Sequence, residues 1–108
     1  DAVLQSNLKL ALDKLQWVIK NSKMASLKQI ARVRAARILL ATKQYQAALN
    51  ILKTVDDPMY QPLIDSVKGD IYRALGKNKL AQQSYQAAKN GFENSGIVDP
   101  FLNMKISE

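Results

Sequence analysis

The sequence contains neither cysteine nor histidine among its 108 residues. Without cysteine the chain forms no disulfide and has no thiolate nucleophile, and without histidine it lacks the commonest general base and zinc ligand. Glycine, with 4 residues, and proline, with 3, are also scarce. Long alternating runs of Val, Ile and Thr, which favour strands, are missing as well, so the composition predicts helices rather than sheets. These absences exclude thiol chemistry, sulfur-based metal sites, and the usual histidine-dependent acid–base and zinc chemistry.

The residues that are present suffice for one folded domain. Hydrophobic residues make up 47% and charged residues 23% of the chain, close to the average of globular proteins. No apolar run approaches the ~20 residues that span a bilayer. The start has none of the residue order of a signal peptide. Because the sequence opens on Asp1 rather than methionine, we expect it to be a processed or excised piece of a longer chain, with any anchor upstream.

Positive charge is concentrated in the first half of the chain. Through Val55, ten Lys and Arg residues against two Asp residues give +8, and from Asp56 onward six basic against seven acidic residues give −1. A basic half suits a nucleic acid, an anionic membrane surface or an acidic protein as partner. The composition therefore leaves open an alternative function, that of a basic helical nucleic-acid-binding domain.

Apolar residues recur three and four positions apart almost throughout the chain, which is the period of an amphipathic helix. The pattern predicts five helices and a short apolar tail, at residues 4–20, 26–42, 45–55, 58–75, 78–90 and 100–106. Ser26 is the expected N-cap of the second helix, and Asp57 before Pro58 that of the fourth, although Pro62 leaves this start open. Gly76 is expected to end the fourth helix in the left-handed conformation. Short connectors predict antiparallel neighbours.

Two parts of the chain share an order of small and large residues at an offset of 33 positions. In each part, a small residue, Ala36 or Gly69, is followed twelve positions later by an alanine, Ala48 or Ala81. Small residues let paired helices approach closely, and a large side chain of the partner helix fills the space beside them. The first predicted helix has only the second half of this pattern, at Ala11, Leu15 and Val18.

This spacing resembles the tetratricopeptide repeat, a helical hairpin of ~34 residues. The resemblance implies an all-α fold of stacked antiparallel hairpins, an α-solenoid fragment, in a single domain. Its parts are a half repeat (4–22), two whole repeats (26–56 and 58–91) and a C-terminal cap (97–108). The first whole repeat has Lys43 where glycine is usual. In the alternative, a plain helical bundle, Ala48 and Ala81 would have unlike surroundings.

Four segments, LQWVI at 15–19, ARVRAARILLA at 31–41, KGDIY at 68–72 followed by Gly76, and LNMKI at 102–106, follow one another along the chain. In order and spacing they resemble the C-terminal part of the ancillary SecYEG translocon subunit family. The resemblance implies a bacterial inner-membrane protein with an N-terminal membrane helix, absent from this sequence, and a periplasmic tetratricopeptide-like domain. It implies protein partners, namely Sec translocon subunits and a membrane-anchored periplasmic chaperone related to prolyl isomerases. It also implies a scaffold without catalysis or cofactors.

Stacked hairpins leave a groove along their first helices, the usual peptide-docking surface of such repeats. Arg37 and Asp70 hold equivalent places one repeat apart, so we expect them to lie near each other on this side. The groove is expected to combine apolar and polar residues from both repeats, and its predicted lining is Val33, Arg37, Leu40, Ser66, Asp70 and Arg73. The alternative that the fifth helix or the tail fills the groove stays open.

The densest cluster of cations, on the second predicted helix, does not form one stripe. At about 100° per residue, Lys28 and Arg32 lie on one flank, and Arg34 and Arg37 lie roughly 120° or more away from both. A DNA-reading helix gathers its cations and polar readers on a single exposed face. We therefore expect no nucleic-acid partner.

Other candidate residues favour structural roles. The adjacent Asp56 and Asp57 are expected to cap a helix rather than to act as an acid pair. Asp65 and Asp70 are five residues apart and have no histidine or third carboxylate beside them, which makes them a poor metal site. Trp17, which stands at core spacing, is expected to pack inside. No catalytic residue, metal site or cofactor site is predicted.

Overall fold

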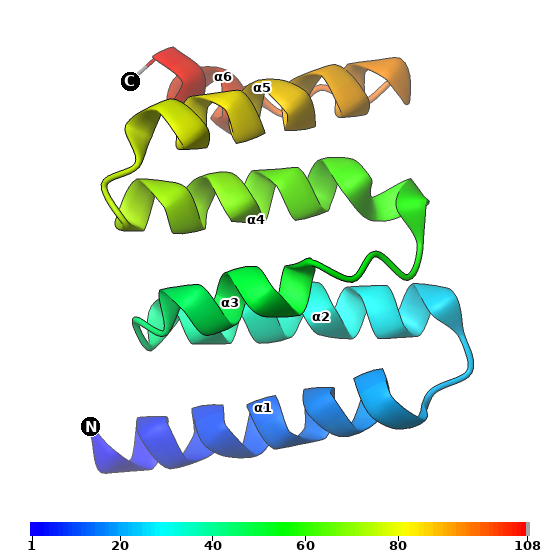
Figure 1. Cartoon of the computed structure of the whole chain (residues 1–108), viewed down its shortest axis with the longest axis vertical. Coiled ribbons are helices and arrows are strands. Elements are labelled where there is room, and N and C mark those ends of the chain that lie inside the picture. Colours follow the sequence, from blue (N-terminus) through cyan, green and yellow to red (C-terminus); the bar gives the residue numbers. More distant parts are fainter. Residues whose placement is uncertain (108) are drawn as a thin grey trace. The chain divides into compact units, whose positions relative to one another are not determined.

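The computed structural model describes residues 1–107. Within them the chain is helical and contains no strand, which confirms the predicted all-α class (Figure 1). The elements are α1 (Ala2–Asn21), α2 (Ala25–Ala41), α3 (Tyr45–Leu52), the short 3-10 helix η1 (Pro58–Tyr60), α4 (Gln61–Ala74), α5 (Asn78–Asn94) and α6 (Pro100–Ser107). The last residue of the predicted cap, Glu108, lies outside the described residues.

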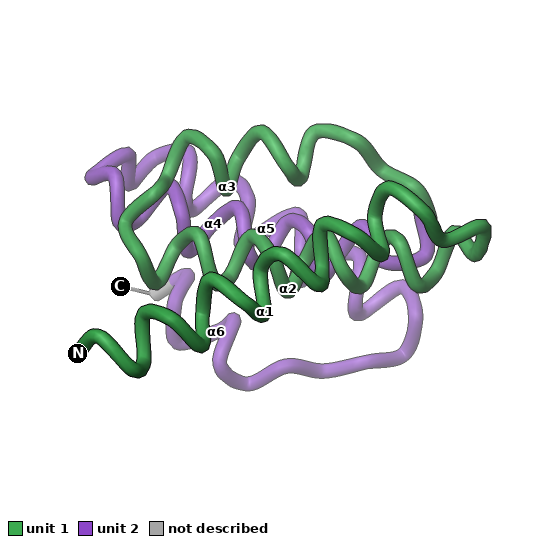
Figure 2. The backbone as a smooth tube through the Cα atoms, turned by 90° about the horizontal axis from the view of Figure 1, so that it is seen from below, with its two compact units in different colours: residues 1–57 green, residues 58–108 purple. Residues whose placement is uncertain are grey.

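The chain divides into two compact units, Asp1–Asp57 and Pro58–Glu108 (Figure 2). In unit 1, α2 packs against both α1 and α3. In unit 2, α4 packs along α5, and α6 packs against α5. The division falls at the connector between the two predicted whole repeats, so each unit contains one helical hairpin with one additional helix.

The start of α2 differs from the prediction. The N-cap is Met24, and the helix begins at Ala25, so Ser26 lies inside the first turn and its predicted capping role is wrong. The hydroxyl of Ser22 instead accepts a hydrogen bond from the Met24 amide at 3.1 Å. This bond lies in the connector between α1 and α2, and the helical period of the sequence does not predict it.

The start of α4 is also displaced from the predicted position. Pro58 opens the 3-10 helix, and α4 begins at Gln61 with Tyr60 as its N-cap and Pro62 in its first turn. The predicted N-cap role of Asp57 for this helix is therefore wrong. Pro62 takes the position at which a missing amide donor costs no helical hydrogen bond.

Three helices close through the same main-chain turn. Lys43, Gly76 and Gly96 follow α2, α4 and α5 with φ angles of 63°, 76° and 78°. In each turn this residue's amide donates to the carbonyl three residues back, and the next amide donates five residues back, at N–O distances from 2.7 to 3.0 Å. These pairs of bonds form the Schellman closure. Lys43 and Gly76 are 33 residues apart, so the turns follow the offset of the sequence pattern.

Equivalent small residues occupy alike positions in the two hairpins. Ala36, Ala48 and Ala81 are 0%, 0% and 2% exposed. Gly69, the counterpart of Ala36, lies against Tyr85, because a Cβ placed on this glycine would be 2.5 Å from Cδ1 of the ring. The structure thus shows the predicted pairing of a small residue on the first helix with a large one on the second. The similarity ends after α3, because Val55 is 39% exposed outside any helix whereas its counterpart Ala88 is buried.

The left-handed Lys43 leads to a stability prediction. A side chain in this conformation costs roughly 1 kcal/mol that glycine avoids. We expect Lys43→Gly to raise the free energy of unfolding of unit 1 by about 1 kcal/mol in urea titrations followed by circular dichroism, and Gly76→Lys to lower that of unit 2 similarly. The control is Ala47→Gly at an exposed position of α3, which should lose about 1 kcal/mol. A loss from Lys43→Gly as large as the control's would contradict the interpretation.

Candidate functional site

The six residues of the predicted groove divide equally between two helices. On α2, Val33 is buried, Arg37 is exposed and Leu40 is half-buried. On α4, Ser66 is buried, Asp70 is half-buried and Arg73 is exposed, so only the first residues of the two sets, Val33 and Ser66, share a burial class. That all six line one groove stays a prediction, as does the pairing of Arg37 with Asp70.

Within unit 2, Asp70 accepts hydrogen bonds from two side chains that the sequence analysis did not connect with it. The Tyr85 hydroxyl donates to its Oδ1 at 2.6 Å, and Nζ of Lys105 donates to the same oxygen at 2.9 Å. Lys105 also lies over the Tyr85 ring, 5.4 Å from its centroid. Asp70 therefore links α4, α5 and α6, and the chain's own tail reaches this side of α4.

The Tyr85 hydroxyl is held in its protonated, donating form. Burial raises the pKa of Tyr85 well above its ordinary value of 10.0, and the hydrogen bond and negative charge of Asp70 raise it further. Arg73 acts in the opposite direction without reversing the shift in pKa. The phenol consequently serves as a fixed hydrogen-bond donor, with no tendency to act as a base near neutral pH.

The short helix α6 is anchored by one buried residue. Leu102 is 1% exposed and joins Ala81, Tyr85 and Ala88 in the core of unit 2. Nε2 of Gln82 donates to the main-chain carbonyl of Lys105 at 3.1 Å. These contacts show the tail docked on unit 2, as its apolar residues indicated.

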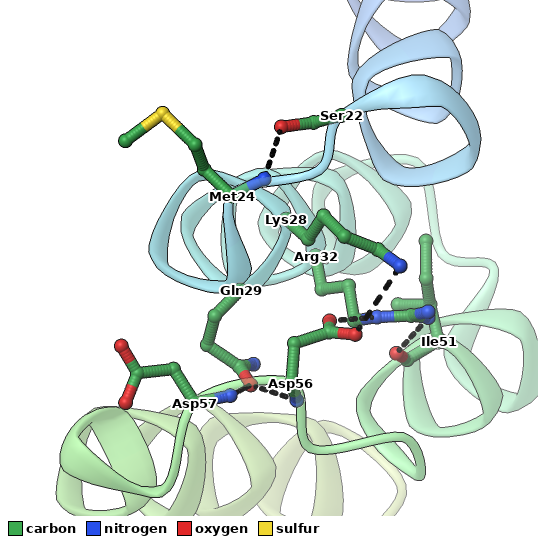
Figure 3. Close-up of polar contacts among 8 residues, drawn as sticks. All are labelled: Ser22, Met24, Lys28, Gln29, Arg32, Ile51, Asp56 and Asp57. Carbon is green, nitrogen blue, oxygen red and sulfur yellow. Dashed lines mark hydrogen bonds and ion pairs between the residues drawn. The ribbon is translucent and has the colours of Figure 1, made fainter.

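On one flank of α2, two cations pair with Asp56 (Figure 3). Nε of Arg32 donates to Oδ2 of Asp56 at 2.6 Å, and Nζ of Lys28 lies 3.8 Å from Oδ1. The guanidinium of Arg32 also donates to the Ile51 carbonyl at 3.3 Å. Asp56 thus binds cations 24 and 28 residues away in sequence, and the prediction that it caps a helix is wrong.

Beside this ion pair, Gln29 holds the main chain that follows α3. Its Oε1 accepts from the amides of Asp56 at 2.7 Å and Asp57 at 3.1 Å, and Figure 3 shows the two bonds converging on one oxygen. Gln29 is 0% exposed, and its Nε2 has no hydrogen-bond partner. Gln29 therefore holds two consecutive amides of the connector that follows α3.

The other flank of α2 borders a surface groove against α1. Three residues of α1 and three of α2 line it: Ala11, Lys14, Leu15, Arg34, Arg37 and Ile38. The cations of α2 thus lie on two separate flanks, as predicted, and those of one flank pair with Asp56. Nothing in this arrangement favours the nucleic-acid alternative. Trp17, expected in the core, is 65% exposed on α1, so that expectation is wrong.

The comparison with known families decides the kind of protein. A family model described as a tetratricopeptide repeat-like domain matches residues 1–108. The chain belongs to the tetratricopeptide repeat-like family. This membership agrees with the observed hairpins, with their common turns and with the buried small residues that pair their helices. No solved structure matches the chain.

Curated relatives of this tetratricopeptide repeat-like chain carry the name ancillary SecYEG translocon subunit. The protein of Neisseria gonorrhoeae is 33% identical over 92 residues, which cover 85% of the chain and 44% of the relative. That of Buchnera aphidicola subsp. Schizaphis graminum is 32% identical over 108 residues, 98% of the chain and 54% of the relative. The chain thus spans about half the length of these relatives, and the resemblance inferred from the four segments is confirmed.

Among the residues described, no helix combines sufficient length with sufficient apolarity to span a bilayer.

Proposed function

We propose that this chain is a protein-binding scaffold of an ancillary subunit of the Sec translocon, and that it acts without catalysis. The observation that carries the proposal is the tetratricopeptide repeat-like match over residues 1–108, together with relatives that bear the translocon subunit name. Tetratricopeptide repeats act by presenting helical surfaces to other polypeptides. The Oε1 atom of Gln29, the carboxylates of Asp56 and Asp70 and the Tyr85 hydroxyl form hydrogen bonds within the chain and serve packing.

The proposed mechanism depends on rigidity. In each unit a first and a second helix pack together, with Ala36 and Ala48 buried in unit 1 and Gly69 lying against Tyr85 in unit 2. A rigid surface loses little conformational entropy on binding, so more of the interaction energy appears as affinity. The proposed partners are translocon subunits and a membrane-anchored periplasmic chaperone, at the periplasmic face of a bacterial inner membrane.

Copurification tests this proposal. The natural protein, tagged and extracted from its own membranes in mild detergent, should retain the translocon subunits, and the chaperone should appear in the same eluate. The control is the same protein with Gly69→Leu, which should disrupt unit 2 by steric overlap with Tyr85. Capture of neither partner by the intact protein would contradict the proposed function, and capture of the translocon alone would contradict the chaperone link.

A further inference from the structure

The groove between α1 and α2 has an apolar floor and a basic rim. Its volume is about 520 Å³, and its floor is formed by Ala11, Leu15 and Ile38. Lys14 on α1 and Arg34 and Arg37 on α2 line its sides. Both helices contribute residues at positions i, i+3 and i+4, which lie on one face of a helix. The groove is therefore formed by the facing sides of two helices and does not depend on a loop.

The three cations of this groove are not neutralised by carboxylates of their own unit. Within the described residues of unit 1, Lys14, Arg34 and Arg37 have no ion pair with a carboxylate of that unit. The contrast with the opposite flank of α2 is direct, because Arg32 there is bound to Asp56. Three unpaired positive charges around an apolar floor favour an occupant that supplies carboxylates.

The outer face of α1 extends this apolar surface. Val3, Leu10 and Trp17 are 72%, 54% and 65% exposed, and they recur every seven residues beside the row that contains Lys14. The helix has no fully buried residue, so it packs through one side only. A seven-residue apolar row next to a groove suits a second helix laid along it.

From these observations we propose that the groove between α1 and α2 binds an acidic amphipathic helix of a partner protein. The inference rests on the proposed protein-binding function and names the chemistry of the partner. Leucine-type side chains of the partner would fill the space over Ala11, Leu15 and Ile38. Its Asp or Glu residues, three or four positions apart, would pair with the rim.

Two other occupants fit the groove less well. A second copy of this chain would bring Lys14, Arg34 and Arg37 against an equally basic surface, and like charges in contact oppose association. A nucleic acid would satisfy the cations but would leave the leucine, isoleucine and tryptophan surface without an apolar partner. An acidic helix satisfies both parts of the surface.

The binding experiment uses Trp17, the single tryptophan of the chain, as the reporter. The probe is a synthetic helical peptide of about 20 residues, without tryptophan, with leucine along one face and glutamate on the remaining positions. Titration should shift the Trp17 emission to shorter wavelength with a Kd on the order of 10 μM. A matched peptide with glutamine in place of glutamate should bind at least tenfold more weakly. Equal binding of the two peptides would overturn the proposal.

Variants then locate the site. The double variant Arg34→Glu with Arg37→Glu should bind the glutamate peptide at least tenfold more weakly than the original chain does. It should bind a peptide with lysine in place of glutamate more tightly. Lys20→Glu combined with Lys53→Glu makes the same change of charge at exposed residues that do not line the groove, and should change the affinity less than twofold. Equal weakening by the two pairs would show that only net charge matters and would overturn the proposal.

Three further measurements separate the alternatives. Sedimentation that shows a dimer abolished by Arg37→Glu, or stronger binding of duplex DNA than of the glutamate peptide, would assign the groove to another occupant and overturn the proposal. So would absence of peptide binding by the product of the full natural reading frame. If the peptide fails to bind while translocon copurification persists, only the groove assignment is wrong. If copurification fails while the peptide binds as expected, the proposed function is wrong and the groove assignment stands.

Discussion

Gly69→Leu should unfold unit 2 or destabilise it by at least about 3 kcal/mol, the largest effect that we expect of any single substitution. The ring of Tyr85 occupies the space in which the first atom of a new side chain would lie, and this ring is 0% exposed. It cannot move aside without breaking its hydrogen bond to Asp70. Circular dichroism during urea unfolding measures the effect. Ala74→Leu, at an exposed position of α4, should change the stability by less than about 0.5 kcal/mol.

The partner substitution tests the cause of this effect. Gly69→Ala should cost about 1 to 3 kcal/mol in the original chain, because even one methyl group overlaps the Tyr85 ring. In a Tyr85→Leu background the ring is absent, and Gly69→Ala should cost at least about 1 kcal/mol less than in the original chain. Independent substitutions differ from additivity by no more than ~0.5 kcal/mol, so a difference of this size would show that the two residues interact. If Gly69→Ala lowered the free energy of unfolding equally in the two backgrounds, overlap with the Tyr85 ring would not be the reason that position 69 requires glycine.

Gln29→Met should destabilise unit 1 by about 2 to 4 kcal/mol, the second large effect. Methionine has nearly the length of glutamine but lacks the oxygen that accepts from the amides of Asp56 and Asp57. Two part-buried donors would then remain unsatisfied, each at a cost of roughly 1 to 3 kcal/mol, partly offset by the greater apolarity of methionine. The expected fall in Tm is on the order of 10 °C or more.

The matched control is Gln46→Met on the exposed surface of α3, where the glutamine side chain donates to Asn50. The free energy of unfolding of this variant should lie within about 0.5 kcal/mol of that of the original chain. If the two methionine variants were equally stable, the hydrogen bonds of Gln29 would contribute nothing measurable. Hydrogen exchange at the amides of Asp56 and Asp57 adds a local readout, since it should accelerate in Gln29→Met alone.

The hairpins were predictable from the sequence because they depend on interactions between near neighbours. The helical period locates the elements, and the glycine signal locates the turn at Gly76. The offset of 33 residues extends that turn to Lys43, where the structure shows the same left-handed conformation without glycine. The pattern of Ala36, Gly69, Ala48 and Ala81 predicted which residues would be buried.

Helix starts were less predictable because several side chains compete to satisfy the same amides. Ser26 and Asp57 both have the chemistry of an N-cap, yet neither caps the helix expected of it. Asp56 forms its bonds with residues 24 and more positions away, and no local pattern reveals such a partner. Gln29 is similar, since a glutamine on a helix gives no sign that it will bind a connector 27 residues later.

The candidate site was only partly predictable for a related reason. Arg37 was recognised as a surface residue, but its observed neighbours, Lys14 and Leu15, come from a helix that the repeat pattern treats as half a repeat. Asp70 was correctly placed on the first helix of its hairpin, but the role of Lys105 depends on how the tail folds back. Contacts between distant segments decide both outcomes, and periodicity carries no information about them.

The common closure of α2, α4 and α5 has a consequence for how such a protein can diversify. The turn is built from main-chain atoms and one left-handed residue, so it demands almost nothing of the helix that follows. The second helix has 8 residues in one hairpin and 17 in the other, yet the turns before them are alike. The length of the second helix can therefore change by insertion or deletion while the turn before it is kept. Such changes would alter the surface that the hairpin presents to other molecules.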